Sequence, residues 1–60
     1  MRGWLLFEQS RYELASNEAR LALADNPDDA DAHALLARCL TELGELDEAT
    51  SEAQIAIHLD

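Results

Sequence analysis

The segment NPDDADAH at residues 26–33 contains three aspartates, and a fourth directly precedes it. They are Asp25, Asp28, Asp29 and Asp31. Carboxylate oxygens are the ligands that calcium prefers in proteins, so the segment is a candidate metal site. A calcium loop between two helices requires a glycine at its sixth place and a glutamate at its twelfth. Counting from Asp25 puts Ala30 at the sixth place. Counting from Asp29 puts Leu40 at the twelfth, so we predict no calcium loop.

The same segment has the residues of a turn between two helices. Pro27 stops a helix that precedes it, because proline lacks an N–H and restricts the residue before it. Asp28 or Asp29 then caps the next helix by accepting backbone N–H groups, and Asp31 adds negative charge at the positive end of its dipole. We therefore interpret residues 26–33 as a hinge.

Softer metal ligands occur at His33, Cys39 and His58, but their spacing is poor. His33 and Cys39 lie six residues apart, on different sides of one predicted helix, and neither a C-x-x-C nor an H-E-x-x-H pattern occurs. We expect a helix-packing role for His33, a core position for Cys39, and a solvated position near a helix C-terminus for His58. A Cys-His nucleophile would need a third group to orient the pair. We expect no metal and no cofactor.

Carboxylates are abundant in the second half of the chain: Glu42, Glu45, Asp47, Glu48 and Glu52. General acid and base catalysis needs such groups to have pKa values pushed apart by burial. These residues fall on helix faces that we expect to be solvated, and Asp47 and Glu48 fall in the first turn of the last predicted helix, where they favour the dipole. We predict no catalytic residue and no enzyme.

Composition limits the remaining classes of protein. Sixty residues make at most one small domain. Alanine and leucine dominate, while Gly3, Gly44 and Pro27 are the only helix breakers, which favours an all-α chain. The net charge of −9 would repel nucleic acid and anionic membranes. One cysteine forms no internal disulfide, and the run WLLF is too short to span a bilayer, so we expect a soluble chain, cytoplasmic by default.

A shift of the sequence against itself by 34 residues reveals an internal repeat. Six pairs of residues are identical: Leu6 and Leu40, Glu8 and Glu42, Ala15 and Ala49, Glu18 and Glu52, Ala19 and Ala53, and Ala22 and Ala56. Other pairs match in size, such as Gly3 with Ala37 and Ser10 with Gly44.

Each repeat has the pattern of a helical hairpin. The first helix of the second copy carries apolar residues at helical spacing: Ala32, Leu35, Leu36, Cys39, Leu40 and Leu43. Gly44 ends it, and the next helix carries Leu46, Ala49, Ala53, Ala56 and Ile57 on one face. Ser10 occupies the corresponding turn of the first copy. We predict helices at about 2–9, 12–25, 29–43 and 46–58.

These residues resemble the tetratricopeptide repeat, a 34-residue helix-turn-helix unit. The shared features are a small residue inside the first helix, the turn residue, a large residue two places on, two alanines in the second helix and a proline at the boundary. In this chain they are Gly3 and Ala37, Ser10 and Gly44, Tyr12 and Leu46, Ala15 and Ala49, Ala22 and Ala56, and Pro27. Departures are His33, where the family often has tryptophan, and Ala19 and Ala53, where it often has phenylalanine.

The resemblance implies an all-α fold in which antiparallel helical hairpins stack as a short right-handed solenoid of about four helices. Residues 1–60 would form a single domain, with a partial first repeat at 1–29 and a second repeat at 30–60. About three such repeats are usually needed for stability, so we expect a piece of a longer array.

Members of the family are generally scaffolds, which implies a protein–protein interaction module whose first helices line a groove for a peptide or a partner helix. The groove residues would be Trp4, Phe7, Glu8, Asp31, Ala34, Leu35, Arg38, Thr41 and Glu42. Trp4, Phe7 and Arg38 have the chemistry of a binding hot spot. The alternative is that Trp4 and Phe7 only pack the short first helix.

One subgroup of the family clamps the C-terminal carboxylate of heat-shock chaperones with basic and amide side chains. At the matching places stand Asp31, Ala34, Leu35 and Arg38, so we expect no such clamp. The expected partner is a protein or peptide that is apolar with basic residues. The alternative function is homo-oligomerisation through an exposed edge at Ile55, Ile57 and Leu59.

Overall fold

A computed structural model describes residues 2–60, which form four helices and no strand. The helices are α1 (Gly3–Glu8), α2 (Tyr12–Asp25), α3 (Ala30–Glu42) and α4 (Leu46–Leu59). Every predicted helix end lies within one residue of the observed one, so the predicted all-α fold is confirmed. Within the described residues, each helix falls short of the length and apolar character that crossing a membrane demands.

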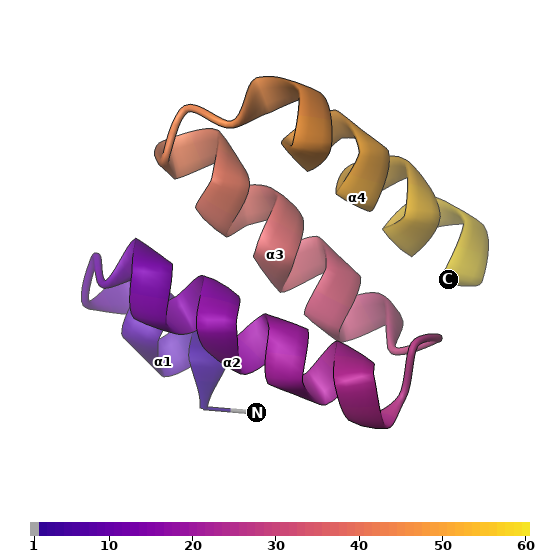
Figure 1. The fold of residues 1–60 in the computed structure, drawn as a ribbon, viewed down its shortest axis with the longest axis horizontal. Coiled ribbons are helices and arrows are strands. Elements are labelled where there is room, and N and C mark those ends of the chain that lie inside the picture. The colour runs from indigo at the N-terminus through magenta and orange to yellow at the C-terminus, as the bar shows by residue number, and fades with distance from the viewer. Residues whose placement is uncertain (1) are drawn as a thin grey trace.

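The helices form two antiparallel hairpins that pack side by side (Figure 1). The first hairpin is α1 with α2, and the second is α3 with α4. α3 lies between α2 and α4 and packs against both, while α1 packs on α2 and also touches α3. The central position of α3 explains why it holds most of the buried residues.

The turns inside the two hairpins are built alike. Ser10 and Gly44 take left-handed backbone conformations, with φ of 61° and 84°. In the first turn the N–H of Arg11 donates to the carbonyl of Leu6 at 2.9 Å, and in the second the N–H of Glu45 donates to that of Leu40 at 2.8 Å. These bonds close the helix ends in the Schellman pattern. The predicted roles of Ser10 and Gly44 as turn residues are confirmed.

The hinge between the hairpins begins and ends with side-chain hydrogen bonds to the backbone. The Asn26 Oδ1 accepts from the N–H of Asp28 at 3.2 Å, and the Asp29 Oδ1 accepts from the N–H of Ala32 at 3.1 Å. Asp29 is therefore the N-cap of α3, which selects one of the two predicted capping residues. Asp31 lies in the first turn of α3, as expected from its charge.

The hydrophobic core joins α3 to small side chains on its neighbours. The buried face of α3 comprises Ala32, Leu35, Leu36, Cys39 and Leu40, all 3% exposed or less. It packs against Ala15 and Ala19 of α2, which are 0% exposed, and against Ala49 of α4. Burying a leucine contributes roughly 1.5–3 kcal/mol, so Leu35 and Leu36 hold the two hairpins together.

The predicted apolar face of α4 is only partly covered. Ala49 is buried, but Leu46 is 62% exposed and Ile57 is 75% exposed. Among the described helices only α3 packs closely against α4, and it covers only part of the apolar stripe. The exposure of Ile57 agrees with its predicted place on an exposed edge.

Candidate partner-binding face

Predicted groove residues of both repeats meet where α1 touches α3. Trp4 and Arg38 occupy equivalent positions in the two repeats, so the two helices present them next to each other. The guanidinium carbon of Arg38 lies 5.9 Å from the ring centroid of Trp4 and 5.2 Å from that of Phe7. Both distances fall within the cation–π range of about 6 Å. These three residues form what we call the aromatic cluster.

Further contacts fix the orientation of the rings. The Trp4 and Phe7 centroids lie 6.0 Å apart at an interplanar angle of 72°, and those of Phe7 and Tyr12 lie 5.3 Å apart at 64°. Edge-to-face pairs of this kind are favourable. The Trp4 Nε1 donates a hydrogen bond to the Asp31 Oδ2 at 2.9 Å and so ties α1 to α3. The cluster is thus ordered before any ligand arrives.

The predicted groove residues differ in how far they are exposed. Trp4 and Phe7 are partly buried and pack against the hydrophobic core, yet each keeps part of its surface accessible. Ala34 is also partly buried. The remaining polar groove residues are exposed: Glu8, Asp31, Arg38, Thr41 and Glu42.

Leu35 is the exception among the predicted groove residues. It is 0% exposed and belongs to the hydrophobic core, so its assignment to the groove was wrong. Successive residues of a helix point about 100° apart, and this rotation turns Leu35 from the face of Ala34 toward α2. We remove Leu35 from the candidate face.

A hollow of about 380 Å³ lies beside Asp31, between the start of α3 and the end of α4. It is lined by Ala30, Asp31, Ala34, Ala56, Ile57 and Asp60. Asp31 both contacts Trp4 and lines this hollow, so it is the residue that the two features share. No binding role was predicted for Ala56 and Asp60, because only the placement of α4 brings them next to α3.

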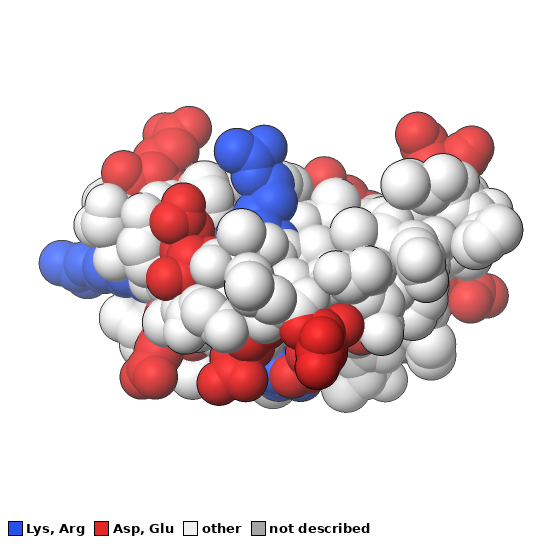
Figure 2. All heavy atoms as spheres, turned by 90° about the horizontal axis from the view of Figure 1, so that it is seen from above, with Lys and Arg blue, Asp and Glu red and all other residues white. Residues whose placement is uncertain are grey.

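The predicted edge residues lie on α4 and are all exposed. Ile55 is 39% exposed, Ile57 75% and Leu59 40%. Figure 2 views the molecule from above Figure 1, and there uncharged surface spreads over much of the right half, with acidic side chains at its margins. An apolar surface is therefore available here for contact.

The candidate metal ligands and the candidate nucleophile do not form a site. In residues 2–60 no group of three or more His, Cys, Asp or Glu side chains lies close enough to hold a metal ion. Cys39 is buried, and its burial raises the pKa of the thiol, which keeps it protonated and unreactive. His58 is exposed in the last turn of α4, as predicted, and His33 is buried between helices.

Comparison with known proteins places this geometry in a family. The family model described as tetratricopeptide repeat matches residues 1–60. The chain belongs to the tetratricopeptide repeat family. Tetratricopeptide repeats are protein–protein interaction modules and are typically non-catalytic, so the chain is assigned to that broad class.

One relative among curated proteins also contains tetratricopeptide repeats. Hsp70-Hsp90 organizing protein 1 of Glycine max is 37% identical over 59 residues, which are 98% of this chain and 10% of that protein. The chain thus spans about a tenth of the length of this relative. No solved structure matches the chain significantly.

The tetratricopeptide repeat also explains a second hollow, of about 420 Å³, between α3 and α4. Its lining includes Ala37, Ala49, Thr50 and Ala53, together with the groove residues Arg38 and Thr41. The counterparts of the first four in the first repeat are Gly3, Ala15, Ser16 and Ala19, all of them buried. In the first repeat, α3 packs against Ala15 and Ala19. The lining of this hollow is the equivalent surface of the second repeat.

Proposed function

We propose that the chain binds a peptide or helix of a partner protein on the face formed by α1, α3 and the end of α4. The observation that carries the proposal is the aromatic cluster, an ordered and partly accessible Trp–Phe–Arg group at the junction of the two repeats. Tryptophan and arginine dominate binding hot spots, and side chains that are already fixed lose little entropy on binding.

Charge on this face favours a partner with apolar and basic residues. Glu8, Asp31 and Glu42 are exposed carboxylates, and the net charge of the whole chain is −9. Arg38 is the one basic residue among the predicted groove positions, and its guanidinium is directed to the two rings. A cationic side chain beside Asp31 would be attracted, whereas an acidic tail would be repelled.

The relative from Glycine max is named for organizing Hsp70 and Hsp90, which supports a protein as the partner class. Binding the free carboxylate at a chaperone's C-terminus requires a cluster of hydrogen-bond donors. Asp31, Ala34 and Arg38 offer one guanidinium beside a carboxylate, so the proposed partner chemistry differs from a carboxylate clamp.

Peptide titration tests the partner chemistry. Two apolar peptides of equal length, one basic and one acidic with a free C-terminal carboxylate, are titrated and followed by Trp4 fluorescence. We expect the basic peptide to bind more tightly. Asp31→Asn keeps an acceptor for Trp4 and removes the charge, so it should weaken that binding, while Asp28→Asn in the hinge should not. Tighter binding of the acidic peptide would overturn the proposed chemistry.

Substitution of Trp4 tests the aromatic cluster itself. Trp4→Ala should weaken binding by about 2 kcal/mol, or roughly thirtyfold, without changing the molecular mass in solution. Leu21→Ala is the control, because it shortens a 67% exposed apolar side chain on α2, outside the face. Calorimetry with both folded variants measures the effect, and equal losses would rule out a special role for Trp4.

A second candidate function is self-association through α4. The observation in its favour is the exposure of Ile55, Ile57 and Leu59 on one helix. Ile57→Glu should then dissociate an oligomer seen by sedimentation, while Leu21→Glu, at a similarly exposed position, should leave it intact. A chain that stays monomeric at high concentration would eliminate this candidate.

A further inference from the structure

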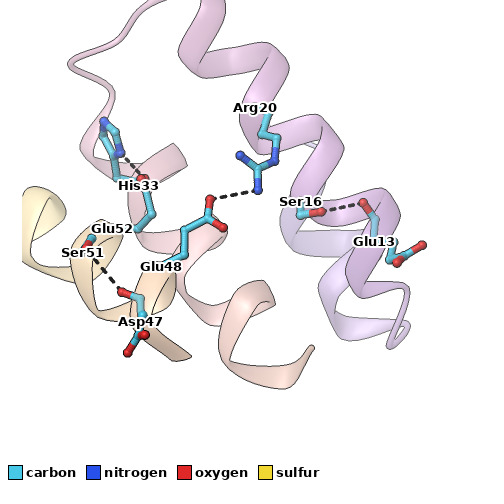
Figure 3. Close-up of polar contacts among 8 residues, drawn as sticks. All are labelled: Glu13, Ser16, Arg20, His33, Asp47, Glu48, Ser51 and Glu52. Carbon is cyan, nitrogen blue, oxygen red and sulfur yellow. Dashed lines mark hydrogen bonds and ion pairs between the residues drawn. The ribbon is translucent and has the colours of Figure 1, made fainter. Parts of the chain in front are cut away.

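His33 makes two hydrogen bonds from a buried position in α3. The side chain is 10% exposed, and its ring bonds to both the hinge and α4. Its Nδ1 lies 2.6 Å from the Glu52 Oε1, and its Nε2 lies 2.8 Å from the carbonyl oxygen of Pro27 (Figure 3 shows the Glu52 contact). One side chain thus connects three segments: the hinge, α3 and α4.

Both partners of the ring are acceptors. A carboxylate and a backbone carbonyl each accept a hydrogen bond, so each needs an N–H from the ring. A neutral imidazole carries one N–H and an imidazolium carries two. Both bonds therefore form together only when His33 and Glu52 hold an additional proton between them, and an imidazolium beside the Glu52 carboxylate supplies one N–H to each acceptor.

The charged groups around His33 support a bound proton. Glu52 faces it from α4, and the Asp29 carboxylate faces it from the hinge. On α2, Arg20 instead pairs with Glu48 at 3.2 Å (Figure 3). Burial of the ring has the largest single effect and lowers the pKa of His33. The hydrogen bonds to Glu52 and Pro27 and the charges of Glu52 and Asp29 together outweigh it, so the pKa is raised above 6.5.

We propose that His33 is a proton-dependent latch, which as an imidazolium holds the hinge and α4 against α3 and on losing its proton releases one of them. Release leaves either the Pro27 carbonyl or the Glu52 carboxylate without its N–H donor. Ala56, which lines the hollow at the end of α4, lies one turn beyond Glu52. The latch therefore also holds this wall of the hollow in place.

The direction of the pH effect follows from the raised pKa. The folded chain binds the proton more tightly than the unfolded chain. The stability that His33 contributes is therefore fully present below about pH 6.5, the ordinary pKa of histidine. It is lost as the pH rises through the higher pKa of the folded state. The latch thus opens as the pH rises above the range of an ordinary histidine.

Nitrogen NMR of the imidazole rings in the 60-residue chain tests the latch directly, with His58→Gln used to assign the signals. We expect both ring nitrogens of His33 to carry protons at pH 6.5, with a titration midpoint above 6.5. Glu52→Gln should lower that midpoint by about 0.5–1 pH. Glu48→Gln, on the same helix but paired with Arg20, should leave it nearly unchanged.

Urea unfolding between pH 6 and pH 8.5 measures the consequence. The midpoint of the wild-type chain should fall as the pH rises, and His33→Gln should remove most of this fall. A neutral His33 throughout, a titration midpoint at or below 6.5, or equal responses to Glu48→Gln and Glu52→Gln would overturn the proposal. The wild-type titration decides the question even where His33→Gln fails to fold.

Discussion

Ser10 and Gly44 occupy the same place in two equivalent turns but tolerate it differently. Both backbones are left-handed, a conformation that costs residues with a Cβ roughly 1 kcal/mol and glycine almost nothing. A Cβ at Gly44 would meet nothing within 4 Å, so the cost there is purely conformational. The internal repeat therefore offers a matched pair of positions.

Exchanging the two residue types should move stability in opposite directions. Ser10→Gly relieves the strained conformation and should stabilise the chain by about 0.5–1 kcal/mol, while Gly44→Ser should destabilise it by about 1 kcal/mol. Urea unfolding followed by circular dichroism measures both. A stabilising Gly44→Ser would contradict the conformational argument.

Individual side-chain contacts were the least predictable feature of the site. Trp4 and Asp31 were both assigned to the groove, but their hydrogen bond joins residues 27 positions apart and has no signature in the sequence. Leu35 is buried and not in the groove, because the rotation between neighbouring helix residues separates its side chain from that of Ala34. Equivalence of Trp4 and Arg38, by contrast, followed from the 34-residue shift alone.

Helices and turns were predictable because their signals are local and occur twice. Gly44 and Pro27 separate apolar stretches of helical spacing, and the shift by 34 residues transfers the Gly44 boundary to Ser10 in the first copy. The sequence does not decide whether Asp28 or Asp29 caps α3, because both are aspartates in adjacent positions before the helix. Backbone geometry selects Asp29, whose carboxylate reaches the N–H of Ala32.

Removing this cap should destabilise the element that both hairpins share. Asp29→Ala deletes the acceptor for the Ala32 N–H and should cost about 1 kcal/mol. Asp28→Ala removes an equal charge from the neighbouring position, whose own N–H is held by Asn26, and should change stability by less than about 0.5 kcal/mol. Equal effects in thermal unfolding would mean that charge rather than capping is responsible.

At the scale of the whole molecule, repulsion among carboxylates opposes the packing around α3. The chain has thirteen acidic and four basic residues. The ion pairs Arg2–Glu18 and Arg20–Glu48 are partly exposed to solvent, so each contributes little. The molecule measures 27 × 23 × 16 Å. At about 0.01 M salt the Debye length is about 30 Å, so nearly all charges interact, whereas at 1 M it is about 3 Å.

Added salt should therefore stabilise this chain, in contrast to a fold held by surface ion pairs. The urea midpoint should rise between about 0.01 M and 0.5 M NaCl, because screening relieves the repulsion that the folded chain concentrates. Replacing Glu8 and Glu42 with glutamine removes two exposed carboxylates and should reduce this salt dependence. A midpoint that falls with salt would show that the ion pairs outweigh the repulsion, and the charge argument for a basic partner would weaken with it.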